Sequence, residues 1–125
     1  MKIEHFALNV AEPTAMAAWY GKHLQTRVRR AIDHPARTHF LEDSQGSVML
    51  EIYNNPPDQV PDYSAMDPLL LHLAFVSENP DADAERLIAA GASLVEKVEL
   101  ADRSELVMLR DPWGLALQLC KRASH

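Results

Sequence analysis

Two short stretches decide the fold of this chain: IEHFALNV at residues 3–10 and LLHLAFV at residues 70–76. Each is an apolar, strand-like run that contains one histidine, and a proline suited to the first position of a helix follows each run. His5 and His72 are 67 residues apart, and the two prolines keep the same spacing. A single offset that relates several matches indicates an internal repeat.

The repeat extends through both halves of the chain, because the same offset carries residues 48–54 onto residues 115–121. Each half has the pattern of one strand, one helix and three further strands. The expected strands are residues 3–10, 26–33, 37–43 and 47–54 in the first half, and residues 70–76, 93–99, 104–110 and 114–121 in the second. Helices are expected after Pro13 and between Pro80 and Gly91. We therefore predict an α+β fold made of two βαβββ modules.

A segment without periodicity separates the two modules. Residues 54–68 contain four prolines, which do not suit the interior of a helix or of a central strand. We predict a first module at residues 1–54, a connecting segment at 55–68 and a second module at 69–125, together forming one domain. The connecting segment is interpreted as a linker, with a flap over a site as the alternative.

Composition and charge exclude several classes of protein. The chain has 125 residues, of which 47% are hydrophobic, and this composition argues against a wholly disordered chain. The net charge of −6 argues against nucleic-acid binding driven by phosphate neutralisation, and no apolar run is long enough to predict a membrane span. Cys120 is the only cysteine, which excludes an intrachain disulfide and a thiolate zinc cluster. We expect a soluble, cytoplasmic protein.

Four polar residues lie at matching positions of the repeat: His5, Glu51, His72 and Gln118. Strand alternation predicts that each stands mid-strand, opposite an apolar stripe. If the two sheets curve toward each other, the four side chains converge. Imidazole nitrogens and a carboxylate suit zinc, nickel, cobalt or iron, whereas an amide oxygen is a weaker, neutral ligand. The alternative is that these are surface residues of the strands.

These positions carry a resemblance that covers nearly the whole chain. The matching features are the runs around His5, Glu51 and His72, the helix through Trp19, and the turn at residues 111–114 (DPWG) that precedes the last strand. In these features the chain resembles the vicinal oxygen chelate superfamily, which includes glyoxalase I, extradiol dioxygenases, fosfomycin-resistance enzymes and bleomycin-resistance proteins. The resemblance implies two βαβββ modules forming a curved mixed sheet around a cup, usually in a homodimer.

Glyoxalase I is the most similar member in size and in ligand positions. The resemblance implies one divalent ion (Zn, Ni, Co or Fe) held by His5, Glu51, His72 and Gln118, with Glu51 as the catalytic group that moves protons. Metalloenzyme members typically carry Glu at the last of these positions. A neutral amide there lowers the expected metal affinity, raises the Lewis acidity of any bound ion, and leaves Glu51 as the single carboxylate base.

Three functions follow from the resemblance. The first is a metal-dependent lyase or isomerase that acts on a small substrate chelated through adjacent oxygens. The alternative is a metal-free protein that sequesters a small molecule, with Tyr53 and Trp113 contributing to an aromatic pocket. An iron dioxygenase using His5, His72 and Glu51 is the third. The expected partner in each case is a small molecule, with sites formed within one chain or between two copies.

Several further arginine, histidine and cysteine residues lie outside the four repeat-matched positions. Arg27, Arg29 and Arg30 form a short basic run that we interpret as a solvated strand face. Arg37 and His39 would meet an anionic substrate if their strand faced the cup. Cys120 is interpreted as a small buried hydrophobic residue.

Overall fold

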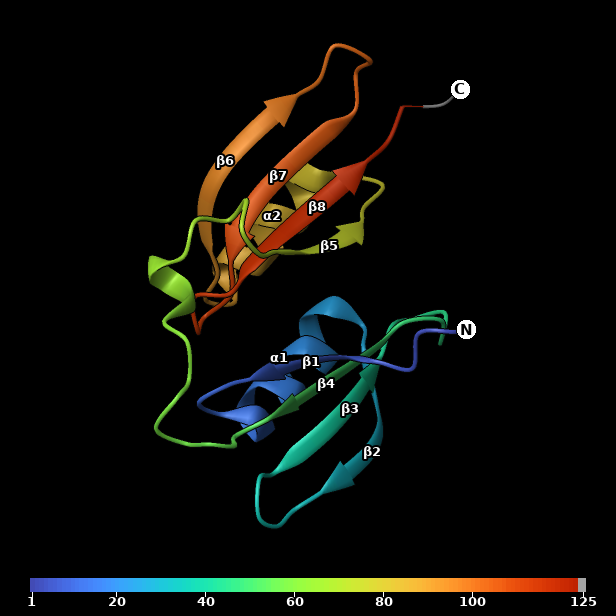
Figure 1. Cartoon of the computed structure of the whole chain (residues 1–125). Coiled ribbons are helices and arrows are strands. Elements are labelled where there is room, and N and C mark those ends of the chain that lie inside the picture. The colour runs from blue at the N-terminus through green and yellow to red at the C-terminus, as the bar shows by residue number, and fades with distance from the viewer. Residues whose placement is uncertain (124–125) are drawn as a thin grey trace. The chain divides into compact units, whose positions relative to one another are not determined.

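The structure, a computed structural model, describes residues 1–123. Contacts between residues divide the chain into two compact units, Met1–Pro61 and Asp62–His125. Each unit contains one α-helix and one four-stranded mixed sheet, in the order βαβββ (Figure 1). The α+β fold with a βαβββ arrangement in each half, predicted from the repeat, is confirmed. No helix among the described residues is long and apolar enough to cross a membrane.

The first unit follows the predicted order closely. Its elements are β1 (Phe6–Asn9), α1 (Pro13–Leu24), β2 (Arg27–Ile32), β3 (Thr38–Glu42) and β4 (Met49–Tyr53). The strand order is β1-β4-β3-β2, with β1 parallel to β4 and the other pairs antiparallel. The parallel pair is possible because α1 and the two following strands supply the long crossover that parallel strands need.

The second unit repeats this topology. Its elements are η1 (Tyr63–Ala65), β5 (Leu73–Val76), α2 (Pro80–Ala89), β6 (Ser93–Glu99), β7 (Glu105–Arg110) and β8 (Ala116–Lys121). The strand order is β5-β8-β7-β6, again with one parallel pair, β5 with β8. The 3-10 helix η1 lies in the segment that was expected to have no regular structure.

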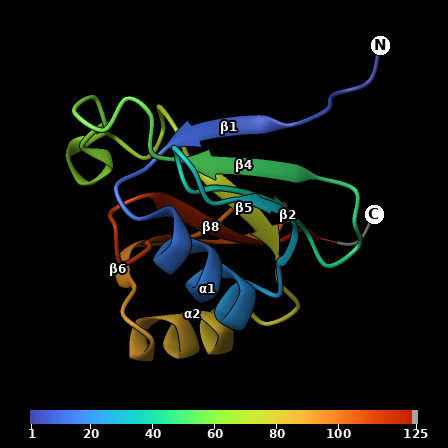
Figure 2. The same cartoon turned by 90° about the horizontal axis from the view of Figure 1, so that it is seen from below.

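The core of the first unit lies between α1 and one face of its sheet, a packing visible in Figure 2. Tyr20 of α1 and Leu41 and Ile52 of the sheet are almost fully buried. Strand alternation predicts that Phe6 and Leu8 share the face that packs on the helix; Leu8 is buried, but Phe6 is 50% exposed, so the prediction is wrong for Phe6. The reason is that β1 is an edge strand, whereas α1 packs over β2, β3 and β4.

The core of the second unit lies between α2 and strands β6, β7 and β8. The apolar pattern between Pro80 and Gly91 predicts that Leu87 and Ile88 both face inward; Leu87 is fully buried, but Ile88 is 41% exposed. At about 100° per residue, Pro80, Ala84 and Leu87 lie within about 60° of one another and form the buried face, whereas Ile88 is turned by about 100° from Leu87 and lies at the edge of that face.

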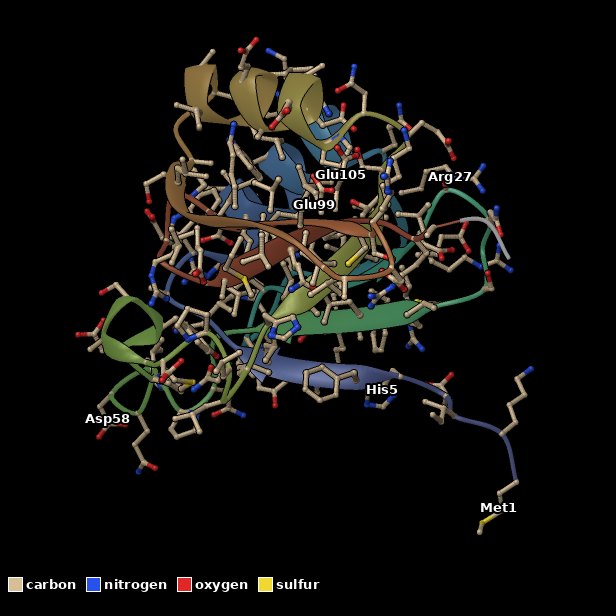
Figure 3. The ribbon with its side chains drawn as sticks, turned by 90° about the horizontal axis from the view of Figure 1, so that it is seen from above. Met1, His5, Arg27, Asp58, Glu99 and Glu105 are labelled. Atoms are coloured by element: carbon tan, nitrogen blue, oxygen red, sulfur yellow. The ribbon has the colours of Figure 1, made fainter. Side chains whose placement is uncertain are left out.

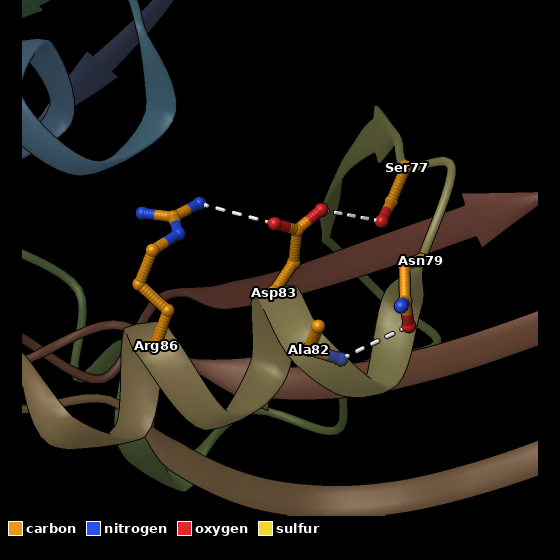
Figure 4. Close-up of polar contacts among 5 residues, drawn as sticks. All are labelled: Ser77, Asn79, Ala82, Asp83 and Arg86. Atoms are coloured by element: carbon orange, nitrogen blue, oxygen red, sulfur yellow. Dashed lines mark hydrogen bonds and ion pairs between the residues drawn. The ribbon is translucent and has the colours of Figure 1, made fainter.

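Local hydrogen bonds fix the start of α2 (Figure 4). The Asn79 side chain accepts a hydrogen bond from the Ala82 backbone N–H at 3.2 Å, which is an N-cap. Ser77 is buried and donates from its hydroxyl to Asp83 at 2.6 Å, and Arg86 lies 3.4 Å from the other oxygen of that carboxylate. The contact of Ser77 with Asp83 ties the residue that follows β5 to the first turns of α2.

The connecting segment is held by different residues in each unit. In the first unit, Asn9 donates to the Pro56 carbonyl and accepts from the Asn55 backbone N–H, both at 2.8 Å. In the second unit, Arg110 donates to the carbonyls of Tyr63 (2.9 Å) and Met66 (2.9 Å). The boundary between the units falls within the segment, after Pro61.

Arg110 joins η1 to the turn between β7 and β8. Besides its two contacts with the η1 region, its guanidinium donates to the Gly114 carbonyl at 3.0 Å. Gly114 has a φ of +91°, and a Cβ on it would lie 2.7 Å from the Ser64 Cβ. Only glycine therefore permits both this turn conformation and the close approach of η1.

Candidate functional site

One face of the first sheet, which we call the first site face, carries the candidate residues of that unit. Ala7, Glu51, Phe40 and Arg30 are register partners across β1, β4, β3 and β2. Directly opposed residues on neighbouring strands project to the same side of a sheet. Because the next residue along β4, Ile52, is buried in the core, the first site face is the one turned away from α1.

His5 and Glu51 meet at this face. The His5 Nε2 lies 2.9 Å from the Glu51 Oε2, and the His5 Nδ1 lies 2.6 Å from the Glu4 Oε1. The imidazole also packs edge-on against the Phe40 ring, with centroids 6.1 Å apart. His5 was expected mid-strand, but it lies just before β1, where Figure 3 shows it beside the strand. The position before the strand leaves both ring nitrogens accessible to acidic side chains.

The two contacts of His5 determine which of its ring nitrogens must carry a hydrogen. A carboxylate can only accept, so the Nδ1 that faces Glu4 carries a hydrogen. The Nε2 of a neutral ring then has a lone pair, and it would face the Glu51 carboxylate, which also only accepts. Two acceptors 2.9 Å apart need a cation, either a second proton on His5 or a metal ion.

In the second unit, His72 has an equivalent orientation. Its Nδ1 lies 2.8 Å from the Pro68 carbonyl oxygen. Since a carbonyl only accepts, Nδ1 carries the hydrogen and Nε2 keeps its lone pair for a ligand. His72 was also expected mid-strand, and it too lies just before its strand, β5. Metal-ligating histidines typically hold their second nitrogen in this way.

Gln118 occupies the position in the second sheet that Glu51 occupies in the first. It is the register partner of Ala74 on β5 and of Met108 on β7. Its Oε1 accepts a hydrogen bond from the Cys120 thiol at 3.1 Å. Burial raises the pKa of the Cys120 thiol, so the thiol stays protonated at neutral pH and remains a donor. The amide oxygen of Gln118 is therefore already engaged by one donor and keeps one further lone pair.

The structure thus brings together one pair of the predicted ligands, His5 and Glu51, within the first unit, and places His72 and Gln118 on the second. Within residues 1–123, no cluster of three or more His, Cys, Asp or Glu side chains could by itself hold a metal ion. The hydrogen bond from Cys120 to Gln118 was not predicted from the sequence. The spacing of two residues between Cys120 and Gln118 on one strand face was the available signal.

The turn at residues 111–114 has a buried acidic anchor. Asp111 is 3% exposed, and its carboxylate accepts hydrogen bonds from the backbone N–H groups of Trp113 (2.9 Å) and Leu115 (3.0 Å). These bonds fix the turn that leads into β8 and so the position of Gln118 on that strand.

Comparisons with known proteins agree with this architecture. A sequence profile described as the Glyoxalase/Bleomycin resistance protein/Dioxygenase superfamily matches residues 2–119. The chain belongs to this superfamily. Its membership confirms the resemblance that was drawn from the histidine-containing runs and the DPWG turn. No curated protein sequence matches the chain.

Solved structures of the glyoxalase family share the fold. A glyoxalase family protein from Bacillus cereus is 16% identical, with a TM-score of 0.83 over 99% of this chain and 95% of that chain. A glyoxalase family protein from Enterococcus faecalis is 27% identical, with a TM-score of 0.73 over 96% of this chain and 97% of that chain. TnmS3, an antibiotic binding protein from Streptomyces sp. CB03234, is 18% identical, with a TM-score of 0.73 over 98% and 99% of the two chains.

Proposed function

We propose that this glyoxalase-superfamily protein binds a divalent cation through His5 and Glu51 and acts on a small molecule that chelates the cation through adjacent oxygens. The observation that carries the proposal is the 2.9 Å separation between the His5 Nε2 and the Glu51 Oε2, with Glu4 on the other ring nitrogen. Carboxylate–histidine–metal arrangements orient the ring and raise its basicity as a ligand. Glu4 supports His5 in this way.

The donor set suits a first-row divalent ion. Imidazole and carboxylate ligands are used by zinc, nickel, cobalt and iron sites. We include His72 in the proposed ligand set because its Nδ1 is held by a carbonyl and its Nε2 keeps a lone pair. Gln118 is included as a neutral oxygen donor, weaker than a carboxylate.

The chemistry proposed for the chain is proton transfer on the bound substrate. A divalent ion supplies Lewis acidity that stabilises negative charge developing on a substrate oxygen. Glu51 supplies the carboxylate base, and its side chain is 18% exposed, which leaves it partly desolvated yet reachable from solvent.

Calorimetric titration of zinc and nickel into the purified protein tests this proposal. We expect binding to be accompanied by proton release, measured as a heat that varies with the ionisation enthalpy of the buffer, because imidazole and carboxylate groups bind a metal ion in their deprotonated forms. Glu51→Gln should weaken binding at least tenfold. Glu42→Gln is the matched control, since Glu42 lies on the same sheet face but pairs with Arg27 at 3.3 Å. Equal losses of metal affinity in Glu51→Gln and Glu42→Gln would contradict the proposed role of Glu51.

A metal-free binding protein is the second candidate, and the Gln118–Cys120 hydrogen bond favours it. That bond engages the amide oxygen and leaves the amide hydrogens of Gln118 to donate to a ligand. The antibiotic binding protein TnmS3 has the same fold. This candidate predicts that a small aromatic ligand binds equally well with and without a chelator, whereas the first predicts that EDTA abolishes binding.

A further inference from the structure

A β-bulge in the first sheet determines which arginine of the basic run reaches the first site face. The pairing of β2 with β3 shifts between Val28 and Arg30, so Arg29 has no register partner. After the shift, Arg30 lies opposite Phe40, and Phe40 in turn lies opposite Glu51. Because Phe40 contacts His5 on the first site face, Arg30 projects from that same face.

The two arginines on this face, Arg27 and Arg30, differ in whether they have a charged partner. Arg27, also on this face, is paired with Glu42 at 3.3 Å. Within residues 1–123 the guanidinium of Arg30 forms no hydrogen bond or ion pair. Arg30 is exposed, so its guanidinium is available to a ligand that approaches the face.

Arg37 and His39, the residues first considered for an anionic substrate, are placed differently. His39 is the register partner of Ile52, so it lies on the opposite side of the sheet from Glu51. Its Nδ1 contacts the Arg37 carbonyl at 2.8 Å. Arg37 lies outside the strands, in the connection between β2 and β3.

We propose that Arg30 binds an anionic group of the substrate, so that the substrate is a small organic oxyanion whose apolar body lies over Phe40. This inference rests on the proposed function, since it places the chelating oxygens at the His5–Glu51 end. A guanidinium pairs with a carboxylate or a phosphate through two parallel hydrogen bonds. Both groups are therefore included in the substrate class.

The sheet geometry sets the length of such a substrate. Arg30 and Glu51 are separated by one intervening strand, so their Cα atoms lie about 10 Å apart. Both side chains project from the same face, and Phe40 lies between them. A single aromatic ring with adjacent oxygens on one side and an oxyanion on the other fits this span.

A matched pair of probes tests the inference on the zinc-loaded protein. The probes are 3,4-dihydroxybenzoate and 3,4-dihydroxybenzamide, which share adjacent oxygens and differ in the charge of the distal group. We expect wild type to prefer the benzoate by about tenfold, as hydrogen bonds to a charged group allow, and Arg30→Gln to lose this preference. Arg37→Gln, which removes the same charge from the same unit, should keep the preference for the benzoate. Titration with 3,4-dihydroxyphenylphosphonate, compared with the benzoate, shows whether the site binds a phosphate-like group or a carboxylate more tightly.

The same titrations with EDTA separate this inference from the proposed function. If zinc does not bind but the benzoate preference persists and is lost in Arg30→Gln, the role of Arg30 stands and the metal proposal fails. Arg30→Lys keeps the charge and should keep most of the preference for the benzoate. Retention in this variant would show that the loss in Arg30→Gln comes from the missing charge and not from a folding defect. No preference in wild type, or an equal loss in Arg37→Gln, overturns the inference.

Discussion

Gln118 is the residue at which the electrostatics of the site change most. In the first sheet the equivalent position is Glu51, a full negative charge, whereas Gln118 is neutral and accepts a hydrogen bond from Cys120. Loss of one carboxylate at ligand distance weakens the attraction for a dication, and part of this loss is offset because no second carboxylate has to be desolvated. The two sheets are therefore equivalent in backbone register but differ in charge.

Gln118→Glu should tighten zinc or nickel binding by at least tenfold, equivalent to about 1.4 kcal/mol, because it restores that charge. It should also supply a second base and raise any hemithioacetal isomerase activity. Calorimetric titration measures the affinity, and Gln45→Glu, in an exposed turn, controls for the change in net charge. Unchanged or weaker metal binding together with a lower melting temperature would instead support a metal-free pocket.

The sequence predicted some of these residues better than others. Strand alternation and the repeat were enough to predict that His5 and Glu51 share a face, and the structure places them 2.9 Å apart. Arg30 was interpreted as part of a solvated strand face, because regular alternation along β2 does not reveal the bulge that sets its register. A bulge depends on pairing with the neighbouring strand, which a single strand sequence does not encode.

At the scale of elements, the strands and helices were predicted to within a few residues. Proline at the first helical position and an N-cap explain this accuracy for α2, which begins at Pro80 as expected. The largest differences occur at β1 and β5, which begin three residues later than the apolar runs suggested. Apolar composition alone does not mark where an edge strand starts to pair.

Arg110 is an element-scale anchor that the sequence did not predict, because its partners are backbone carbonyls distant along the chain. Arg110→Met should lower the free energy of unfolding by about 2 kcal/mol or more, since a half-buried cation donates to three carbonyls and the substitution removes all three hydrogen bonds. Urea denaturation measures this change.

Two further variants make the Arg110 prediction specific. Arg110→Lys should recover part of the lost stability, because it retains the charge but not the forked geometry. Arg86→Met removes an arginine of α2 that lies 3.4 Å from the Asp83 carboxylate, a long contact at the surface, and should cost less than about 1 kcal/mol. An equal loss in Arg86→Met and Arg110→Met would show that Arg110 has no special role.

At the scale of the whole molecule, duplication gives two units with the same strand order and different chemistry. The first unit holds the pair of His5 and Glu51 with Arg30 on the same sheet face, and the second holds His72 and the neutral amide of Gln118. The fold followed from the repeat because each unit repeats one hydrophobic pattern. The homodimer and the position of residues 55–68 relative to a ligand remain predictions.

Metal content per chain tests the central claim most directly. Protein purified without chelators or a metal-affinity tag, and then incubated with zinc, nickel, cobalt or ferrous iron, should retain about one divalent ion per chain by elemental analysis. Glu51→Gln and His72→Ala should each reduce this content to near zero, because each removes a ligand proposed for the same ion. Wild-type protein that remains metal-free after incubation with all four ions would contradict the proposed metal-dependent function.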